Sequence, residues 1–577
     1  MAVFETATPT SSLKIMEKTI IYQVFTRLFG NKNRRNKING SLSENGCGKM
    51  NDFTLKALNE IKNLGVTHIW YTGIIEHAIT TDYSEYNISK DYPEVVKGKA
   101  GSPYAIKDYY DVNPDLAVDV NNRISEFEEL VERSHQQELK VIIDFVPNHV
   151  ARHYVSDAKP KGVKDLGEDD DNTVNFNRNN NFYYLPGEIF DGPVTPQGSD
   201  HWIENPAKVT GNDCLSAKPG INDWYETVKI NYGVDIFNHG SHHFDPIPDT
   251  WDKMLHILLY WSAKKVDGFR CDMAEMVPVE FWNWVIPKVK EHYPHVIFVA
   301  EIYNPDLYRQ YITFGGFDYL YDKVGMYDTL KAIVQGYEQP NAITRAWDKI
   351  NGIHKHMLFF LENHDEQRIA SPFFAGDAKK GIPAMVVSGA IYSNPLMLYF
   401  GQELGEPGMD IEGYSGQDGR TSIFDYWGVK LYQDWANDGL YDGALLSAEA
   451  RELRIWYRKF LHIIKNNETI QLGKFYDLLW CNEHNDAFDG SKLYAFLRYT
   501  EKQILLVLVN FSDEKFTGRI IIPAHAFVTM GAESKKFFKG KDILGEQNKI
   551  SFPQEVAIAN GVGFKIDAYS AGIYELK

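Results

Sequence analysis

Eight short apolar segments recur along most of the chain and alternate with longer segments of helical period. They are residues 20–26, 66–71, 141–145, 266–271, 296–300, 319–320, 357–361 and 396–399. Between them, stretches such as 124–138 and 251–264 repeat apolar residues every three or four positions, as on one face of an amphipathic helix. Several apolar segments show no polar alternation, which is typical of strands covered on both faces. The pattern predicts a (β/α)₈ barrel, whose functional residues follow the carboxyl ends of the strands.

Two regions depart from this alternation. Residues 151–246 are rich in Gly, Asn and Pro and are far longer than an ordinary βα loop, which predicts a subdomain inserted after the third strand. Beyond about residue 465, apolar alternation returns in LYAFLRYT, QILLVLVNFS, GRIIIPA and AGIYELK, which predicts a C-terminal antiparallel β-sandwich domain. The predicted parts are therefore a barrel (1–150 and 247–465), an insertion (151–246) and a C-terminal domain (466–577).

Composition excludes several classes of function. The chain has 60 basic and 78 acidic side chains, and a net charge of −18 disfavours binding to nucleic acid or to anionic membranes. Its 4 cysteines are too few for a disulfide scaffold and lack the spacing of a zinc site. The most apolar stretch, 384–400, is interrupted by polar residues and proline, so we expect no membrane span.

The N-terminal segment gives no sign of a signal peptide. The first twenty residues contain neither a basic region nor an apolar one of the kind that a signal peptide needs. We therefore expect either a cytoplasmic protein or one whose leader has been removed.

Polar side chains follow four of the predicted strands. The segments are DFVPNH (144–149), GFRCD (268–272), VIFVAE (296–301) and LFFLENHD (358–365). Strand alternation places Arg270 and Asp272 on one face of the sheet. Because the carboxyl ends of barrel strands meet at one mouth, we expect a single cluster that contains Asp272, Glu301, Asp365, His149, His364 and Arg270.

Each of these residues, taken alone, could have a purely structural role. An acid at a strand end is often a helix cap or a surface charge, and Arg270 beside Asp272 could be a structural ion pair. Three acids in one confined site are harder to explain structurally, because like charges raise one another's pKa. Glycosidic bond cleavage requires such a group, with an ionised carboxylate near the anomeric carbon and a carboxylic acid at the leaving oxygen. Arg270 would keep Asp272 ionised, and the apolar surroundings of Glu301 suit a general acid.

The four segments DFVPNH, GFRCD, AEIY and FLENHD resemble the four signature regions of the α-amylase family, glycoside hydrolase family 13. The segments IIYQVFTRLFG, GVTHIWYTGIIEH, SPYAIKDYYDVNP, LMLYFGQELG and LVLVNFS also fit, so the resemblance covers nearly the whole chain. It implies Asp272 as nucleophile, Glu301 as acid/base and Asp365 as transition-state stabiliser. It also implies a retaining mechanism, with the carboxyl groups of the first two about 5 Å apart. The substrate contacts assigned in this way are Tyr104, His149, Arg270, His364, Glu275 and Tyr303.

Other positions depart from the family pattern. Many members have Lys-His three and four residues after the nucleophile, and that His supplies a backbone contact to calcium; here the residues are Glu275 and Met276. Asn148 matches another calcium ligand, so the resemblance implies a structural Ca²⁺ with an incomplete ligand set and no cofactor for the chemistry. The acidic stretch 168–172 lacks EF-hand spacing and is interpreted as a solvated loop. Ala105 stands where the family usually has Asp.

The sequence therefore predicts a retaining hydrolase that cleaves α-1,4-glucosidic bonds in starch, glycogen fragments or maltooligosaccharides. A transglycosylase (a maltosyl- or glucanotransferase, or a trehalose-forming enzyme) is the alternative, because a sugar hydroxyl can intercept the same intermediate. The changed residues Glu275 and Met276 keep this alternative open. A non-catalytic family member is disfavoured because all three acids are present. The expected partner is an α-glucan, and the sequence indicates no oligomeric state.

Overall fold

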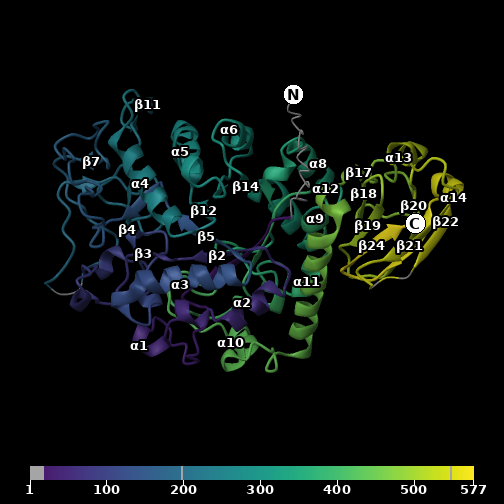
Figure 1. The fold of residues 1–577 in the computed structure, drawn as a ribbon, viewed down its shortest axis with the longest axis horizontal. Helices are drawn as coiled ribbons and strands as arrows, with labels where there is room; N and C mark the ends of the chain where they lie inside the picture. Colours follow the sequence, from purple (N-terminus) through teal and green to yellow (C-terminus); the bar gives the residue numbers. More distant parts are fainter. Residues whose placement is uncertain (1–17, 197–198, 546, 548) are drawn as a thin grey trace, which may run out of the picture.

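The computed structural model of the chain describes residues 18–196, 199–545, 547 and 549–577 (Figure 1). The absence of a signal peptide was predicted from the first twenty residues, of which 1–17 lie outside the described residues. No helix within the described part of the chain is long and apolar enough to cross a membrane.

Eight parallel strands form the central sheet, as the sequence predicts. Their spatial order is β15-β14-β13-β12-β5-β2-β1-β16. A parallel bridge between Phe359 and Leu396 joins the two ends, so the sheet closes into a barrel. The strand predicted at 357–361 is regular over two residues only; Phe359 forms a single bridge, and residues 360 and 361 pair with no strand. The bounds are β1 Ile20–Phe25, β2 His68–Thr72, β5 Lys140–Phe145, β12 Gly268–Cys271, β13 Ile297–Ala300, β14 Tyr319–Tyr321, β15 Met357–Leu358 and β16 Leu396–Tyr399.

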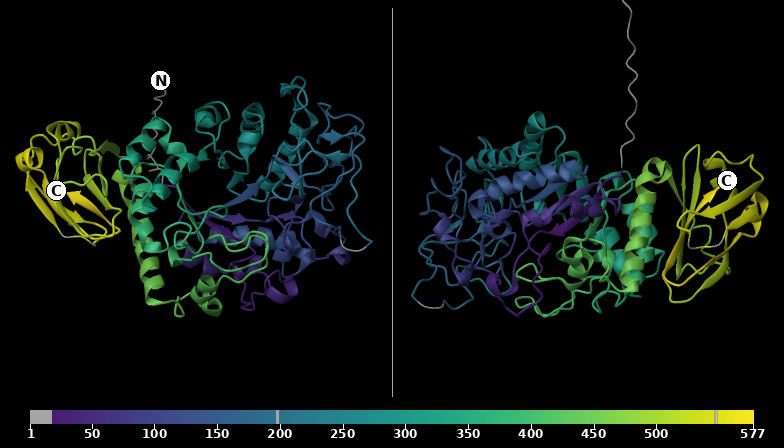
Figure 2. Two further views of the ribbon diagram at one scale, coloured as in Figure 1. Left: turned by 180° about the vertical axis from the view of Figure 1, so that it is seen from behind. Right: turned by 60° about the horizontal axis from the view of Figure 1, so that its bottom comes forward.

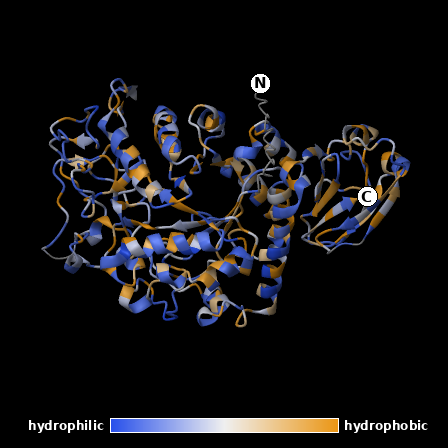
Figure 3. Cartoon of the chain, in the orientation of Figure 1, coloured by the Kyte–Doolittle hydropathy of each residue, from blue (hydrophilic) through white to orange (hydrophobic). Residues whose placement is uncertain are grey.

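Helices cover the outside of the barrel. In α3 (Arg123–Gln136), Phe127, Leu130 and Val131 are buried, and the remaining face is largely charged. Figure 3 shows this mixture of hydrophilic and hydrophobic residues along α3 and along α11. The other helices of this part are α1 Leu42–Asn45, α2 Leu55–Lys62, α4 Asp249–Ala263, α5 Val279–His292, α6 Tyr308–Thr313, α7 Asp328–Val334, α8 Ala342–Lys349, α9 Ile382–Ala390, α10 Lys430–Ala436, α11 Ala448–Asn466 and α12 Glu468–Leu472.

Two excursions from the barrel build one side of the mouth. After β2, the strands β3 (Ile75–His77) and β4 (Ile106–Val112) pair antiparallel, an element that the sequence analysis did not predict. After β5 comes the insertion, which consists of short antiparallel pairs. These are β6 His149–Ala151 with β9 Thr227–Lys229, β7 Tyr184–Leu185 with β8 Ala207–Lys208, and β10 Val234–Asp235 with β11 Ser241–His242.

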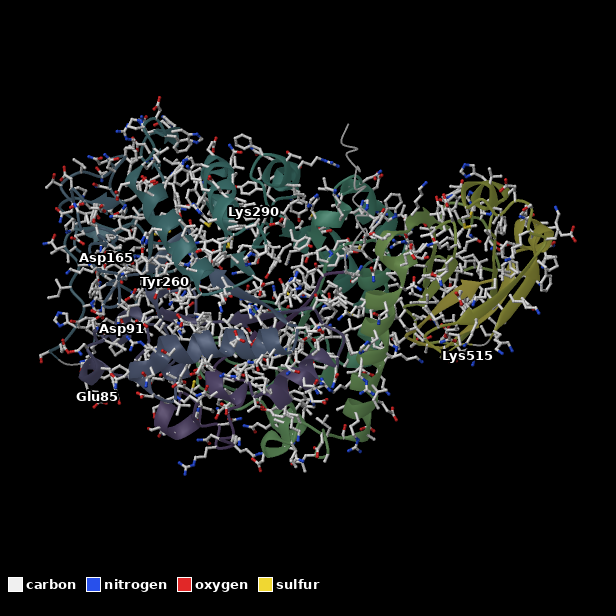
Figure 4. The ribbon with its side chains drawn as sticks, viewed as in Figure 1. Glu85, Asp91, Asp165, Tyr260, Lys290 and Lys515 are labelled. Carbon is white, nitrogen blue, oxygen red and sulfur yellow. The ribbon has the colours of Figure 1, made fainter. Side chains whose placement is uncertain are left out.

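The C-terminal domain is antiparallel, as predicted. A six-stranded sheet has the order β17-β18-β19-β24-β21-β22, and β20 and β23 form a second, two-stranded sheet. The domain and the insertion lie at opposite ends of the molecule (Figures 1 and 2), as the labels Lys515 and Asp165 indicate in Figure 4. The exact residue limits of the barrel, the insertion and the C-terminal domain stay a prediction. The bounds are β17 Lys474–Asp477, β18 Leu493–Tyr499, β19 Ile504–Asn510, β20 Phe516–Ile520, α13 Ala524–Thr529, β21 Phe537–Asp542, β22 Ile550–Pro553, α14 Gln554–Ala559, β23 Val562–Ile566 and β24 Ser570–Leu576.

Candidate active site

A pocket of about 300 Å³ opens at the carboxyl ends of the barrel strands. Asp272 directly follows β12, Glu301 directly follows β13, and Asp365 lies in the segment after β15. Because these strands are parallel neighbours in one barrel, their ends bring the three acids to one place. The residues predicted from the sequence that line the pocket are Tyr104, His149, Asp272, Glu301, Tyr303 and Asp365.

Arg270 lies beneath this pocket and contacts two of the acids. Its Nη1 is 2.6 Å from Oδ1 of Asp272, and its Nη2 is 2.7 Å from Oε2 of Glu301. The side chain is 1% exposed, and its guanidinium group also lies 5.2 Å from the ring centroid of Tyr104. Strand alternation pairs Arg270 with Asp272 alone, whereas the guanidinium group contacts both carboxylates. One planar group therefore contacts both acids at the floor of the pocket.

The carboxylate of Glu301 receives donors on both oxygens. The backbone N–H of Met273 donates to Oε2 over 2.8 Å, and the hydroxyl group of Tyr303 donates to Oε1 over 2.9 Å. With Arg270 on Oε2, these contacts fix the orientation of the carboxylate at the edge of the pocket. Tyr303 lies two residues after Glu301, in the irregular segment that follows β13.

A chain of polar contacts connects Asp365 to the first strand. Nε2 of His364 lies 3.0 Å from Oδ2 of Asp365 and 2.6 Å from the hydroxyl oxygen of Tyr104. On its other side, Nδ1 of His364 lies 2.8 Å from Nε2 of Gln23. His364 is itself buried, so it holds Tyr104 and Asp365 in place from behind. Gln23 is a functional position that the sequence pattern does not predict, although it is the one amide side chain in the buried strand IIYQVF.

The titratable groups of the pocket differ in their preferred charge. Burial raises the pKa of Asp272, and the adjacent Arg270 works against this rise. Burial alone would raise the pKa of Asp365. The neighbouring His364 and Arg270 outweigh this effect and hold the pKa of the carboxyl below its usual value. Burial lowers the pKa of His149 to about 3, and the nearby Lys229 adds to the effect. A neutral His149 and an ionised Asp365 are therefore expected beside Asp272 at neutral pH.

Glu275, a predicted substrate contact, does not line the pocket. Its Oε2 accepts hydrogen bonds from the backbone N–H groups of Tyr303 and Asn304 over 3.0 and 2.9 Å. The side chain therefore stabilises the turn that presents Tyr303. Asp108 and Tyr109, from the same segment as Tyr104, are also buried outside the pocket.

Asn148, the predicted metal ligand, has a lysine as its partner. Its Oδ1 accepts a hydrogen bond from Nζ of Lys229 over 2.6 Å. Its side-chain nitrogen donates to the carbonyl oxygen of Gly211 over 2.8 Å. A divalent cation requires oxygen atoms that no other cation occupies, so this arrangement does not fit calcium at Asn148.

A second group of acids lies outside the pocket. Carboxylate oxygens of Glu76, Asp108 and Asp111 lie within 4.8 Å of one another, and all three residues are buried. Arg123 forms an ion pair with Asp111, and Nζ of Lys107 is 3.5 Å from Glu76. These basic partners offset the charge of the acids, so we interpret the cluster as structural.

The remaining walls of the pocket come from the insertion and from the segment after β16. Trp224 belongs to the insertion, and its ring centroid lies 5.1 Å from that of His149. Ile423 and Phe424 also line the pocket, in a segment without helical or strand period that gives no sequence signal. Lys97 and Glu226 complete the rim as an ion pair of 3.0 Å.

The fold and the pocket together define a barrel enzyme with a cluster of carboxylates at its mouth. Residues 23–426 match the family model of the α-amylase catalytic domain. The chain therefore belongs to the α-amylase family, whose members act on α-glucans.

Individual relatives are distant. The chain is 22% identical over 512 residues to α-amylase 2 of Dictyoglomus thermophilum, an alignment that covers 86% of this chain and 70% of the relative. It is 24% identical over 265 residues to the α-1,4-glucan:maltose-1-phosphate maltosyltransferase of Picrophilus torridus, which covers 44% and 31% of the two chains. The structure of a maltogenic α-amylase from Thermotoga neapolitana matches with a TM-score of 0.62 at 18% identity and covers 97% and 99% of the chains. The relatives thus include both hydrolases and a transferase.

Proposed function

We propose that the protein is a retaining glycoside hydrolase that cleaves α-1,4-glucosidic bonds in starch, glycogen fragments or maltooligosaccharides. The observation that supports this proposal most directly is the contact of Arg270 with both Asp272 and Glu301 at one pocket, which Asp365 also lines. Family membership supports the choice of an α-glucan as substrate.

In the proposed reaction, Asp272 attacks the anomeric carbon and forms a glycosyl ester, while Glu301 donates a proton to the leaving oxygen. Glu301, now a carboxylate, then takes a proton from water, and the oxygen of that water displaces Asp272 from the sugar. Asp365 accepts hydrogen bonds from sugar hydroxyls, and these contacts tighten in the transition state. All groups in these steps are side chains, so the chemistry needs no cofactor.

Product analysis tests the proposal. Maltoheptaose and soluble starch are incubated with the wild type, with Glu301→Gln, and with Glu366→Gln as a matched control. Glu366 suits this role because its carboxylate contacts Lys323 and Lys331 outside the pocket. We expect shorter products from the wild type and the control and none from Glu301→Gln. A fluorinated glucosyl donor should label the peptide that contains Asp272, as a covalent intermediate requires.

The transglycosylase alternative is supported by the likeness to a maltosyltransferase. It predicts products longer than maltoheptaose from the same incubations. Equal traces from the wild type and Glu301→Gln would contradict both versions of the proposal.

A further inference from the structure

Lys229 lies at the junction between the insertion and the barrel. It is the last residue of β9, the inserted strand that pairs with β6, and its register partner there is His149. The side chain is 8% exposed, so its ammonium group is shielded from solvent. A buried ammonium group is stable only with acceptors around it.

Three oxygen atoms surround this ammonium group. Nζ of Lys229 is 2.6 Å from Oδ1 of Asn148, 2.9 Å from Oδ1 of Asp213 and 3.5 Å from the carbonyl oxygen of Met276. An ammonium group has three donor hydrogens and no acceptor, which matches this number of oxygens. The three partners come from the end of β5, from the insertion and from the turn after Asp272, so one charge connects segments distant in the sequence.

Two of these oxygens belong to positions at which the family resemblance implies calcium contacts, namely the side chain of Asn148 and the backbone of Met276. Calcium takes oxygen ligands of this kind, a carboxylate, an amide and a carbonyl. A lysine ammonium and a calcium ion cannot use the same oxygens at once, because both are positively charged and fill the same space.

We propose that the ammonium group of Lys229 takes the place of a calcium ion at this junction, so that the protein needs no calcium there. Lys229 is then a positioning residue. The side-chain nitrogen of Asn148 lies 3.0 Å from Nδ1 of His149, which lines the pocket. Met276 ends the short helical turn that begins two residues after Asp272. By holding both, Lys229 fixes the insertion against the segment that presents Asp272.

Thermal unfolding tests this proposal without any assay of activity. The midpoint is measured in EDTA and in excess calcium for the wild type, Lys229→Ala and Lys208→Ala. Lys208 is a matched control because it is a lysine of another inserted strand, β8, and its ammonium group lies over the ring of Phe182. For the wild type and for Lys208→Ala, we expect that each protein has the same midpoint in EDTA as in calcium.

For Lys229→Ala in EDTA, we expect a midpoint at least about 3 °C below that of Lys208→Ala, since three acceptors lose their donor. Calcium should raise the midpoint of this variant alone, because it can bind to the vacated oxygens. Asp213→Asn gives a milder second variant, whose midpoint should also fall, since its carboxylate is partly exposed and folding is easier to retain.

Three results would overturn the proposal. The first is a wild type that EDTA destabilises, with the effect abolished by Asn148→Ala. The second is a Lys229→Ala protein as stable as Lys208→Ala. The third is a folded Lys229→Ala protein that does not respond to calcium, which would show that the position is not equivalent to a cation site.

Discussion

The hydroxyl group of Tyr303 donates a hydrogen bond to Oε1 of Glu301 over 2.9 Å. The other oxygen, Oε2, is contacted by Arg270 and by the backbone N–H of Met273. Tyr303 is therefore the partner of the oxygen that these two groups do not contact. Both residues line the pocket, and both follow the same strand, β13. The orientation of the proposed acid therefore depends on a side chain only two positions away.

Replacing Tyr303 by Phe should lower kcat by about 10- to 100-fold, because a hydrogen bond to a charged group contributes about 1.5–3 kcal/mol. KM should change little, since the aromatic ring remains in the wall. Initial rates on maltoheptaose measure both quantities. Tyr308→Phe is the control, because its hydroxyl lies 3.5 Å from Asp322, outside the pocket. Equal losses in the two variants would contradict a specific role for Tyr303.

Trp224 forms part of the wall beside His149, where its ring can stack on a sugar. Trp224→Ala should therefore raise KM for maltoheptaose by about 10-fold, the effect of losing roughly 1.5 kcal/mol of stacking, with a smaller change in kcat. Steady-state kinetics over a range of substrate concentrations give the two constants. Trp480→Ala removes an exposed ring from the C-terminal domain and should leave KM unchanged. An unchanged KM in both variants would show that the sugar does not stack on Trp224.

The sequence predicts the barrel well because strands buried on both faces have an unbroken apolar signal. It also predicts which residues meet at the mouth, since Asp272, Glu301 and Asp365 each follow such a strand. It does not predict the β3–β4 pair, whose register is interrupted by irregular steps. Nor does it predict that Ile423 and Phe424 close the pocket, because a long segment without period can take many paths. The double contact of Arg270 depends on side-chain geometry that strand alternation alone does not specify.

Acid should destabilise the fold through His68. Burial lowers the pKa of His68 to about 3, whereas an unfolded chain takes up a proton on histidine below about pH 6.5. The unfolded state therefore binds more protons in this range, and the free energy of unfolding falls as pH falls. Between about pH 7 and about pH 5, His68 should account for a loss of about 2 kcal/mol.

Urea unfolding at several pH values measures this effect. His68→Gln, which does not titrate, should lose less stability on acidification than the wild type does. His201→Gln is the control, because His201 is exposed and should leave the pH dependence unchanged. If the free energy of unfolding of His68→Gln falls with pH as steeply as that of the wild type, other groups cause the acid sensitivity.

Arg498 connects the C-terminal domain to the barrel. This buried side chain donates hydrogen bonds to the carbonyl oxygens of Ala390, Ile470 and Gly473 over 2.9, 2.9 and 2.7 Å. Arg498→Met leaves these acceptors without their donor, at a cost of about 1–3 kcal/mol for each buried group. Scanning calorimetry should show a midpoint several degrees lower. Arg519→Met, in an exposed position of the same domain, should have little effect, and equal shifts would contradict the prediction.

The central sheet of the C-terminal domain has two apolar faces. Tyr494 and Phe496 of β18 belong to the same core as the barrel, whereas Leu493 and Leu497 belong to the separate core of the domain. On the barrel side, α9 packs against β19 and β24 of this sheet. A shortened enzyme that ends near residue 465 would expose the apolar surface of α9 on the barrel to water, and the domain expressed alone would expose the face of its sheet that carries Tyr494 and Phe496. Exchange of this domain between relatives would therefore have to preserve the apolar contact with α9, and a fusion partner belongs at the end of the chain rather than at the boundary.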